Sequence, residues 1–273
     1  MTTNESRTGP APRLGEGLSL ARMPAHWMLG RLGKRVMRPG GFGPSRRMIA
    51  NLGITESDDV IELWPGLGRT AALALANHPR SYLGVERGEA EAARARAQLD
   101  GPNRRCIVAP AHRTGLPDSS ASVLYGEALL TLEPSARKRE ILAEAARLLR
   151  PDGRFGSHEL LLIPDTLSEA AKDEINTALT KVLRIGARPL TRTEWRDLLS
   201  EHGFTVREEE TCPLLLLDPR TVLADEGLVG TATIAGRALW HPEVLPRLAA
   251  ILSTFHRYRD HLGAITFTAT RTG

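Results

Sequence analysis

The stretch DVIELWPGLGRT, residues 59–70, decides how the rest of this 273-residue chain is interpreted. Its first five residues are mostly apolar and predict a strand, two glycines follow in a turn, and a helical pattern begins at Arg69. Glycines in such a turn let the backbone approach a ligand closely, and the free N–H groups of a new helix favour a polar or anionic group. The stretch therefore predicts a ligand-binding strand-turn-helix unit.

A second predicted strand supports this interpretation. The residues YLGV, 82–85, precede Glu86, which follows Glu62 by 24 residues. A carboxylate at the tip of the second strand offers two acceptor oxygens to the hydroxyls of a ribose. The alternative is an ordinary strand-turn-helix unit with a surface glutamate, but the glycine turn and the acidic tip together favour a nucleoside site.

The order of elements predicts an α/β fold. Short apolar runs alternate with longer helical patterns from Asp58 onward, which is typical of βαβ units and a parallel sheet. Strands are predicted at 59–63, 81–85, 105–108, 121–125, 154–162, 204–210 and 264–269. Helices are predicted at 24–37, 45–52, 69–78, 88–99, 135–149 and 191–202. The run RPGGFGP, 38–44, is expected to separate the first two helices.

The chain is predicted to form a single domain over residues 19–273 after a flexible arm at 1–18. Within that domain we expect a helical cap at 19–53, a cofactor-binding core at 54–211, a helical insertion or lid at 212–261 and the last strand at 262–273.

Composition narrows the classes of protein. Apolar residues make up 41% of the chain and charged residues 25%, as in ordinary globular proteins. There is no apolar run of about 18 residues and no apolar leader at the start, so a cytoplasmic protein without a membrane partner is expected. The only cysteines, Cys106 and Cys212, stand far apart, which gives no support to a disulfide framework or a metal site.

Basic residues gather near the start of the chain. Residues 1–47 contain nine basic and two acidic residues, which would suit an anionic partner. Arg31, Lys34, Arg35 and Arg38, however, alternate with apolar residues at helical spacing, which favours one solvated helix face. Aromatic residues are 4% of the chain, too few for recognition of RNA by stacking, so a nucleic-acid partner is not expected.

These motifs resemble those of the class I S-adenosylmethionine-dependent methyltransferases, in particular the ubiquinone/menaquinone-biosynthesis-like (methyltransferase type 11) group. The resemblance covers about residues 40–210 and the last strand. It implies a Rossmann-like, seven-stranded, mostly parallel sheet with an antiparallel last strand and helices on both faces. It also implies S-adenosylmethionine as cofactor and methyl transfer to an O, N or C atom of a small molecule.

The resemblance also implies which residues hold the cofactor. The family pattern acidic-x-Gly-x-Gly-x-Gly, which cradles the methionine part, maps onto Glu62 and onto the turn that contains Trp64, Pro65, Gly66 and Gly68. The ribose ligand maps onto Glu86, with Arg87 beside it. The loop 107–112 looks like the one that covers the adenine, through Ala111 and His112, and strand four ends at Glu127 in the methyl-transfer region.

Two residues depart from the family pattern. Trp64 stands at the first glycine, so its indole either packs under the turn or intrudes on the methionyl site. The alternative function is therefore a methyltransferase-fold protein with an altered cofactor site, which acts as a non-methylating binding or partner subunit or catalyses another reaction on a small metabolite. Pro110 replaces an aspartate that contacts the adenine in many relatives, and the Ala111 N–H and His112 are expected to supply that contact.

Three residues are candidates for catalysis. Glu127, His158 and Glu159 are predicted to cluster near the carboxyl ends of strands four and five, beyond which ligands bind in open α/β sheets. Histidine suits proton removal from an acceptor because its ordinary pKa lies near neutrality. A structural or substrate-contacting role for His158 remains the main alternative, and Glu127 is expected to contact cofactor or substrate.

Overall fold

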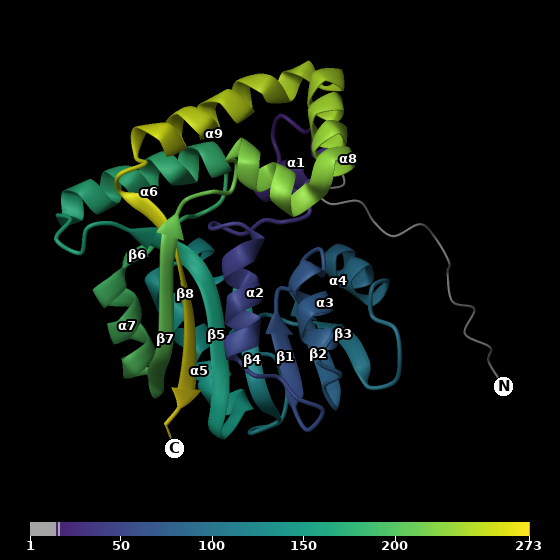
Figure 1. The fold of residues 1–273 in the computed structure, drawn as a ribbon. Coiled ribbons are helices and arrows are strands. Elements are labelled where there is room, and N and C mark those ends of the chain that lie inside the picture. Colours follow the sequence, from purple (N-terminus) through teal and green to yellow (C-terminus); the bar gives the residue numbers. More distant parts are fainter. Residues whose placement is uncertain (1–14, 16, 273) are drawn as a thin grey trace.

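The computed structural model describes Gly15 and residues 17–272, so the predicted arm lies almost wholly outside the described residues (Figure 1). The strands are β1 (Asp59–Leu63), β2 (Ser81–Glu86), β3 (Arg104–Val108), β4 (Ala121–Glu127), β5 (Leu149–Leu162), β6 (Leu190–Thr191), β7 (Phe204–Pro213) and β8 (Leu262–Arg271). The helices are α1 (Ala25–Leu32), α2 (Phe42–Asn51), α3 (Arg69–Leu75), α4 (Glu89–Arg96), α5 (Ser135–Leu148), α6 (Glu169–Leu183), α7 (Arg192–Glu201), α8 (Pro219–Trp240) and α9 (Leu245–Arg257). Two 3-10 turns are η1 (Leu130–Leu132) and η2 (Pro242–Val244).

The strands form one mixed sheet in the order β3-β2-β1-β4-β5-β8-β7. Strands β3, β2, β1, β4 and β5 run parallel, whereas β8 is antiparallel to both β5 and β7. The two-residue β6 adds an eighth strand beside β5. The predicted fold class is confirmed. The parallel register brings the carboxyl ends of β1, β2 and β4 to one edge of the sheet.

Helices cover both faces of the sheet (Figure 1). Successive side chains of a strand point to opposite faces, so Ile61 belongs to a core that includes Leu142 of α5 and Trp195 of α7, whereas Val60 belongs to one that includes Met48 of α2 and Ala74 of α3. The core strands are therefore buried on both sides, which explains their nearly continuous apolar sequences.

Four helices, α1, α6, α8 and α9, lie above the edge where the parallel strands end, and we call them the roof (Figure 1). Their inner sides share a core that includes Met28, Leu32, Val244 and Ile251. This core is built by segments before β1, between β5 and β6, and after β7.

The first two helices differ from the sequence prediction. Helix α1 ends at Leu32, and not at Met37, because Gly33 adopts a left-handed conformation with φ 109° that ends the helix. Residues 33–41, which we call the strap, then cross toward the sheet without helical structure. Helix α2 begins at Phe42 and includes Pro44, because the first turn of a helix does not need the N–H that proline lacks.

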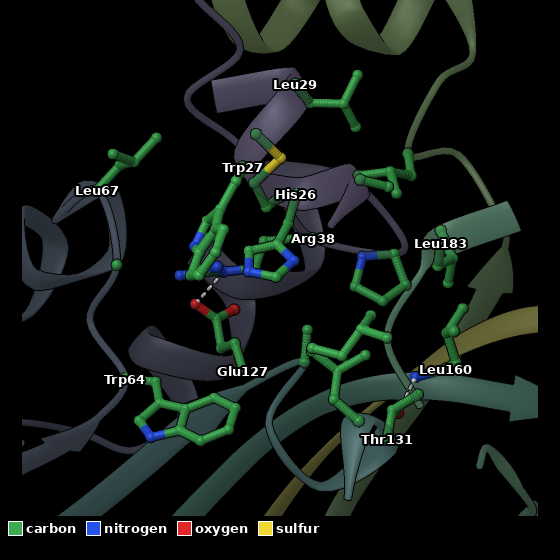
Figure 2. Close-up of a pocket in the computed structure, with 18 of the residues that line it drawn as sticks. His26, Trp27, Leu29, Arg38, Trp64, Leu67, Glu127, Thr131, Leu160 and Leu183 are labelled. Atoms are coloured by element: carbon green, nitrogen blue, oxygen red, sulfur yellow. Dashed lines mark hydrogen bonds and ion pairs between the residues drawn. The ribbon is translucent and has the colours of Figure 1, made fainter. Parts of the chain in front are cut away.

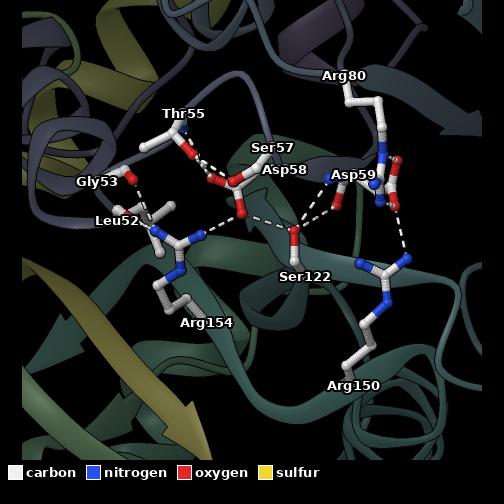
Figure 3. Close-up of polar contacts among 10 residues, drawn as sticks. All are labelled: Leu52, Gly53, Thr55, Ser57, Asp58, Asp59, Arg80, Ser122, Arg150 and Arg154. Atoms are coloured by element: carbon white, nitrogen blue, oxygen red, sulfur yellow. Dashed lines mark hydrogen bonds and ion pairs between the residues drawn. The ribbon is translucent and has the colours of Figure 1, made fainter.

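Polar contacts fix the opposite edge of the sheet (Figure 3). The Asp58 carboxylate accepts hydrogen bonds from the Ser122 hydroxyl at 2.7 Å and from Arg154, whose guanidinium also donates to Gly53 O at 2.7 Å. Asp59 is paired in the same way with Arg80 and with Arg150. These contacts tie the starts of β1 and β4 to β5 and to the end of α2, far from the edge below the roof.

Candidate functional site

A cavity of about 190 Å³ lies between the strand ends and the roof (Figure 2). Its floor comes from the residues that follow β1, β2 and β4, and its upper side comes from the strap and the roof helices. The residues that the following paragraphs use are Trp64, Gly66, Glu86, Arg87 and Glu127 on the floor, and His26, Trp27, Arg38, Leu183 and Phe255 above.

Glu86 and Gly66 form one side of the cavity. The Gly66 N–H donates to Glu86 Oε1 at 2.6 Å, and only 2% of Glu86 is exposed. Burial raises the pKa of the Glu86 carboxyl to about 7, although the Gly66 N–H and Arg87 favour its charged form. Gly66 adopts φ 61°, and only the Trp64 carbonyl oxygen lies within 4 Å of the place a Cβ would occupy. The glycine thus leaves open space for a ligand beside the carboxylate.

Trp64 stands at the turn between Glu86 and Glu127, and its side chain forms part of the cavity (Figure 2). Its φ of 56° is a left-handed value that a tryptophan adopts only with strain, which explains why a glycine suits this position. The Arg87 guanidinium lies 4.8 Å from the centre of the Trp64 ring and 5.9 Å from that of Trp27 in α1. The indole Nε1–H is buried and has no hydrogen-bond partner among the described residues.

Arg38 and Glu127 form a buried ion pair. Arg38, in the strap, donates from Nε to Glu127 Oε2 at 2.6 Å, and their side chains are 11% and 1% exposed. The hydroxyls of Ser45 and Thr70 also donate to the Glu127 carboxylate. Burial opposes the charged form of Glu127, but Arg38 and the other donors outweigh it and lower the pKa of Glu127 to about 2. The pair therefore presents a carboxylate and a guanidinium side by side in the cavity.

His158 lies behind this pair and is fully buried. Its Nδ1 is 3.0 Å from the Ser45 hydroxyl and 3.4 Å from Glu127 Oε1, while its Nε2 accepts the Gly40 N–H at 3.2 Å. An Nε2 that accepts a hydrogen bond leaves the proton on Nδ1 in the neutral ring. His158 therefore connects the strap to Glu127, and both of its ring nitrogens have partners.

Glu159 is also fully buried and holds the turn after β4 in place. Its carboxylate accepts the N–H groups of Leu130 at 3.1 Å and Thr131 at 2.8 Å, and the Ser157 hydroxyl at 3.0 Å. Thr131 lines the cavity, whereas Glu159 and His158 stand behind it. Of the three predicted catalytic residues, Glu127 alone lines the cavity. A catalytic role for Glu127, His158 or Glu159 stays a prediction.

Glu62 lies under the floor on the α2 and α3 side of the sheet. Its Oε2 accepts hydrogen bonds from the Tyr82 hydroxyl and, at 2.7 Å, from the Tyr125 hydroxyl. Burial raises the pKa of Glu62 to about 7, against the effect of these two hydroxyls and Arg38. Glu62 thus connects three neighbouring strands and does not line the cavity.

The raised pKa of Glu62 gives a testable pH dependence. The folded protein binds this proton more tightly than the unfolded chain, so the stabilisation is complete below about pH 4.5 and is lost as the pH rises through 7. Glu62→Gln keeps an acceptor for both hydroxyls and removes the titration. We expect urea unfolding to show a decline in stability between pH 5 and 7 that is shallower in this variant, by up to about 1.4 kcal/mol per pH unit. Parallel profiles would contradict this assignment.

The other residues predicted to bind the cofactor, Pro65, Gly68, Ala111 and His112, do not line the cavity. Gly68 precedes α3 with φ 70°, the Pro65 ring lies next to Gly84, and Ala111 is buried in the α5 side of the core. His112 is half-buried and does not line the cavity either. Their contacts with a cofactor stay predictions.

Arg38 is the main cavity residue that the sequence did not single out. The helical spacing of the basic residues favoured a solvated face, but that interpretation is wrong for Arg38, which pairs with Glu127, and for Lys34, which is 2% exposed and lies 3.8 Å from Glu226 in α8. The signal that marks Arg38 is its place next to the sequence Pro39-Gly40-Gly41, where a helix must already have ended.

Comparisons with known proteins show what this chain is similar to. A family model described as a methyltransferase domain matches residues 62–156. An uncharacterized protein of Haemophilus influenzae is 32% identical over 222 residues, which are 78% of this chain and 85% of that protein.

Solved structures show the same fold at low sequence identity. The cyclopropane synthase MmaA2 from Mycobacterium tuberculosis has a TM-score of 0.69 at 15% identity and covers 89% of this chain and 93% of its own. Phosphoethanolamine N-methyltransferase 2 of Haemonchus contortus, in complex with phosphomonomethylethanolamine and S-adenosylhomocysteine, has a TM-score of 0.61 at 14% identity and covers 89% of this chain and 56% of its own.

The sheet order and the strand-turn-helix site define a protein of the methyltransferase fold. The domain match adds to this that residues 62–156 are a methyltransferase domain, within a chain that has the fold of the class I S-adenosylmethionine-dependent methyltransferases.

Proposed function

We propose that this chain binds S-adenosylmethionine and transfers its methyl group to an apolar small molecule, as a cytoplasmic enzyme. One observation carries the proposal: a single cavity has Glu86 beside an open glycine turn, the Arg38–Glu127 pair, and one wall of apolar residues. These three surfaces are complementary to a nucleoside, to an α-amino acid and to an apolar acceptor.

The residues present fit the cofactor. Glu86 offers carboxylate oxygens to the ribose hydroxyls, and Gly66 leaves the space that a ribose needs beside it. Arg38 and Glu127 carry the two charges that would pair with the carboxylate and the ammonium of the methionine part. When bound, the cofactor supplies a methyl group on a positively charged sulfur.

The acceptor side of the cavity is apolar. Leu160, Leu183, Leu214 and Phe255 line it, and only Thr131 adds a hydroxyl from the turn after β4. Apolar walls exclude water from the reaction and favour an acceptor with little charge. Because the pKa of Glu127 is lowered to about 2, we assign this residue to binding and not to proton removal.

Calorimetric titration tests the proposal directly. We expect S-adenosylmethionine and S-adenosylhomocysteine to bind, and no heat at millimolar ligand would overturn the proposal. Transfer of a labelled methyl group to a panel of apolar and charged small molecules then tests the acceptor class, and labelling confined to the charged members would contradict it.

Trp64 keeps a second function under consideration. Because its indole forms part of the cavity, a protein that binds a metabolite without methyl transfer, as a partner subunit or with another reaction, would also suit this site. Binding without transfer to any acceptor would favour that function.

Replacement of Trp64 by glycine distinguishes the two. The change removes the strain of φ 56° and an unpaired buried N–H, and it enlarges the cavity. We therefore expect the affinity for S-adenosylhomocysteine to stay the same or to increase by up to about tenfold. An increase would show that the indole obstructs the site, and a clear loss of affinity would contradict this expectation and make the indole a cofactor contact.

A further inference from the structure

Helix α8 carries an apolar outer face that no described residue covers. Leu228 and Val229 are 78% and 82% exposed, and Leu239 and Trp240 are 73% and 85% exposed. Between these two pairs the exposed residues include Ala232, Ala235 and Gly236. From 228 to 240 the only charged residue is Arg237. We call the exposed residues Leu228, Val229, Ala232, Ala235, Gly236, Leu239 and Trp240 the α8 outer face.

The fold explains the inner side of this helix but not its outer face. Ile234 and Ala238 pack into the roof core with α1, which requires one apolar side only. Gly227, with φ 73° and ψ 174°, breaks α8 immediately before Leu228, so the outer face belongs to a separate straight segment. Two pairs of large apolar side chains at opposite ends of one such segment form a contiguous patch, which in proteins marks an interaction surface.

Basic side chains surround the α8 outer face. The Arg35 guanidinium lies beside Gly230, and the Arg237 guanidinium lies beside Gly33 at the end of α1. Residues 17–38 contain five basic residues and no acidic one. Lys34 and Arg38 belong to buried ion pairs with Glu226 and Glu127, whereas Arg22 and Arg35 are exposed and Arg31 is half-buried. A second copy of the chain docked through the same face would bring these positive charges together, whereas an anionic surface would neutralise them.

We propose that the α8 outer face docks onto an anionic lipid bilayer and lies in its interface. Exposed tryptophan and leucine on one side with arginines at the margin is the pattern of a helix that rests on a membrane. No helix in the described part of the chain is long and apolar enough to cross one. The proposal departs from the expectation, drawn from the sequence, of no membrane partner, and it does not depend on methyl transfer.

The docked helix is connected to the cavity. Glu226, the residue before the break, accepts the N–H groups of Arg35 and Val36 at 2.7 and 2.8 Å and so holds the strap that carries Arg38. Docking would therefore place the roof of the apolar cavity at the lipid surface, where apolar molecules concentrate.

Flotation with vesicles tests the proposal. The full chain is expected to float with vesicles of phosphatidylcholine that contain phosphatidylglycerol, and to bind less at high salt or to vesicles of phosphatidylcholine alone. The double variant Leu239→Ser with Trp240→Ser should lose about tenfold or more in partitioning. Val108→Ser, a matched control at an exposed valine of β3 that is 43% exposed, should bind like the unchanged protein.

Fluorescence gives a second readout. Of the four tryptophans, Trp195 is buried, Trp27 and Trp64 are half-buried, and Trp240 is exposed. Vesicles should shift the emission to shorter wavelength, and Trp240→Phe should float as before without this shift. Failure to bind anionic vesicles overturns the proposal, as does binding that the double variant leaves unchanged. A dimer in sedimentation that the double variant dissolves, without vesicle binding, would assign the face to a second copy.

Discussion

Arg38→Ala is expected to lower the free energy of unfolding by about 3–5 kcal/mol, because it leaves the Glu127 carboxylate buried without its cation. The same change removes the only arginine or lysine that the described structure pairs with Glu127. Urea unfolding at neutral pH measures the loss, and calorimetry under conditions where the variant is folded should also show weaker binding of S-adenosylhomocysteine.

Two further variants distinguish the stability lost by breaking this buried ion pair from the stability lost by removing any charged side chain. Arg137→Ala breaks an exposed pair with Glu140 on α5 and should cost no more than about 1 kcal/mol. Arg38→Met combined with Glu127→Gln removes both charges, so it should be less destabilising than Arg38→Ala alone. If the double change is as destabilising as the sum of the two single changes, Arg38 and Glu127 do not interact in the way that the structure indicates.

The sheet was predictable from the sequence because each of its strands has a local sequence pattern. The core strands are buried on both faces, so each appears as a short apolar run between turn residues, and the predicted bounds of β1 to β4 lie within two residues of the observed ones. The bounds of β5 differ more, because its first residues extend back to pair Leu149 with Ala121 at the edge of the sheet.

The roof was less predictable because tertiary contacts define it. Helix α6 has no strong start signal beyond Ser168, whose hydroxyl accepts the Ala171 N–H, and was not predicted. Helix α1 ends at Leu32 although the apolar spacing continues to Met37. The strap that follows is held by Glu226, which accepts the Val36 N–H from 190 residues away.

The residues of the candidate site also differ in whether a local sequence pattern marks them. Trp64, Gly66 and Glu86 were found because a turn and a strand tip are local patterns, and the cavity brings them together. Arg38 was not found because its partner is 89 residues away, and a basic residue at helical spacing has the same sequence signature whether it is solvated or paired. A buried ion pair between distant segments has no local signal.

Glu86→Ala is expected to weaken the binding of S-adenosylhomocysteine by about 5- to 150-fold, the 1–3 kcal/mol that a lost buried polar contact typically costs. The carboxylate would accept the ribose hydroxyls, and alanine has no acceptor. Because Glu86 also accepts the Gly66 N–H at 2.6 Å, Glu86→Gln serves as a second variant that keeps an oxygen for this bond. Both variants should bind weakly, while Glu86→Gln should keep more of the stability of the unchanged protein.

Glu89→Ala is the matched control, since this carboxylate begins α4 three residues later, pairs with Arg96 and is 65% exposed. It should bind S-adenosylhomocysteine like the unchanged protein. If Glu86→Ala and Glu89→Ala bind S-adenosylhomocysteine with equal affinity, Glu86 does not contact the cofactor.

The pH dependence of binding follows from the same carboxylate. The pKa of Glu86 is raised to about 7 by burial, so below neutral pH the free protein carries a proton on this carboxyl. The charged carboxylate is the form that accepts hydrogen bonds from both ribose hydroxyls, so binding would release the proton. Affinity for S-adenosylhomocysteine should therefore fall as the pH drops from 7.5 to 5.5, by up to about tenfold per unit. Glu86→Gln cannot titrate and should lose this dependence, whereas Glu62→Gln, which changes a carboxyl with a similarly raised pKa outside the cavity, should keep it. The opposite result, dependence lost in Glu62→Gln and kept in Glu86→Gln, would place the proton on the buried network below the floor, and the ribose contact would have to be reassigned.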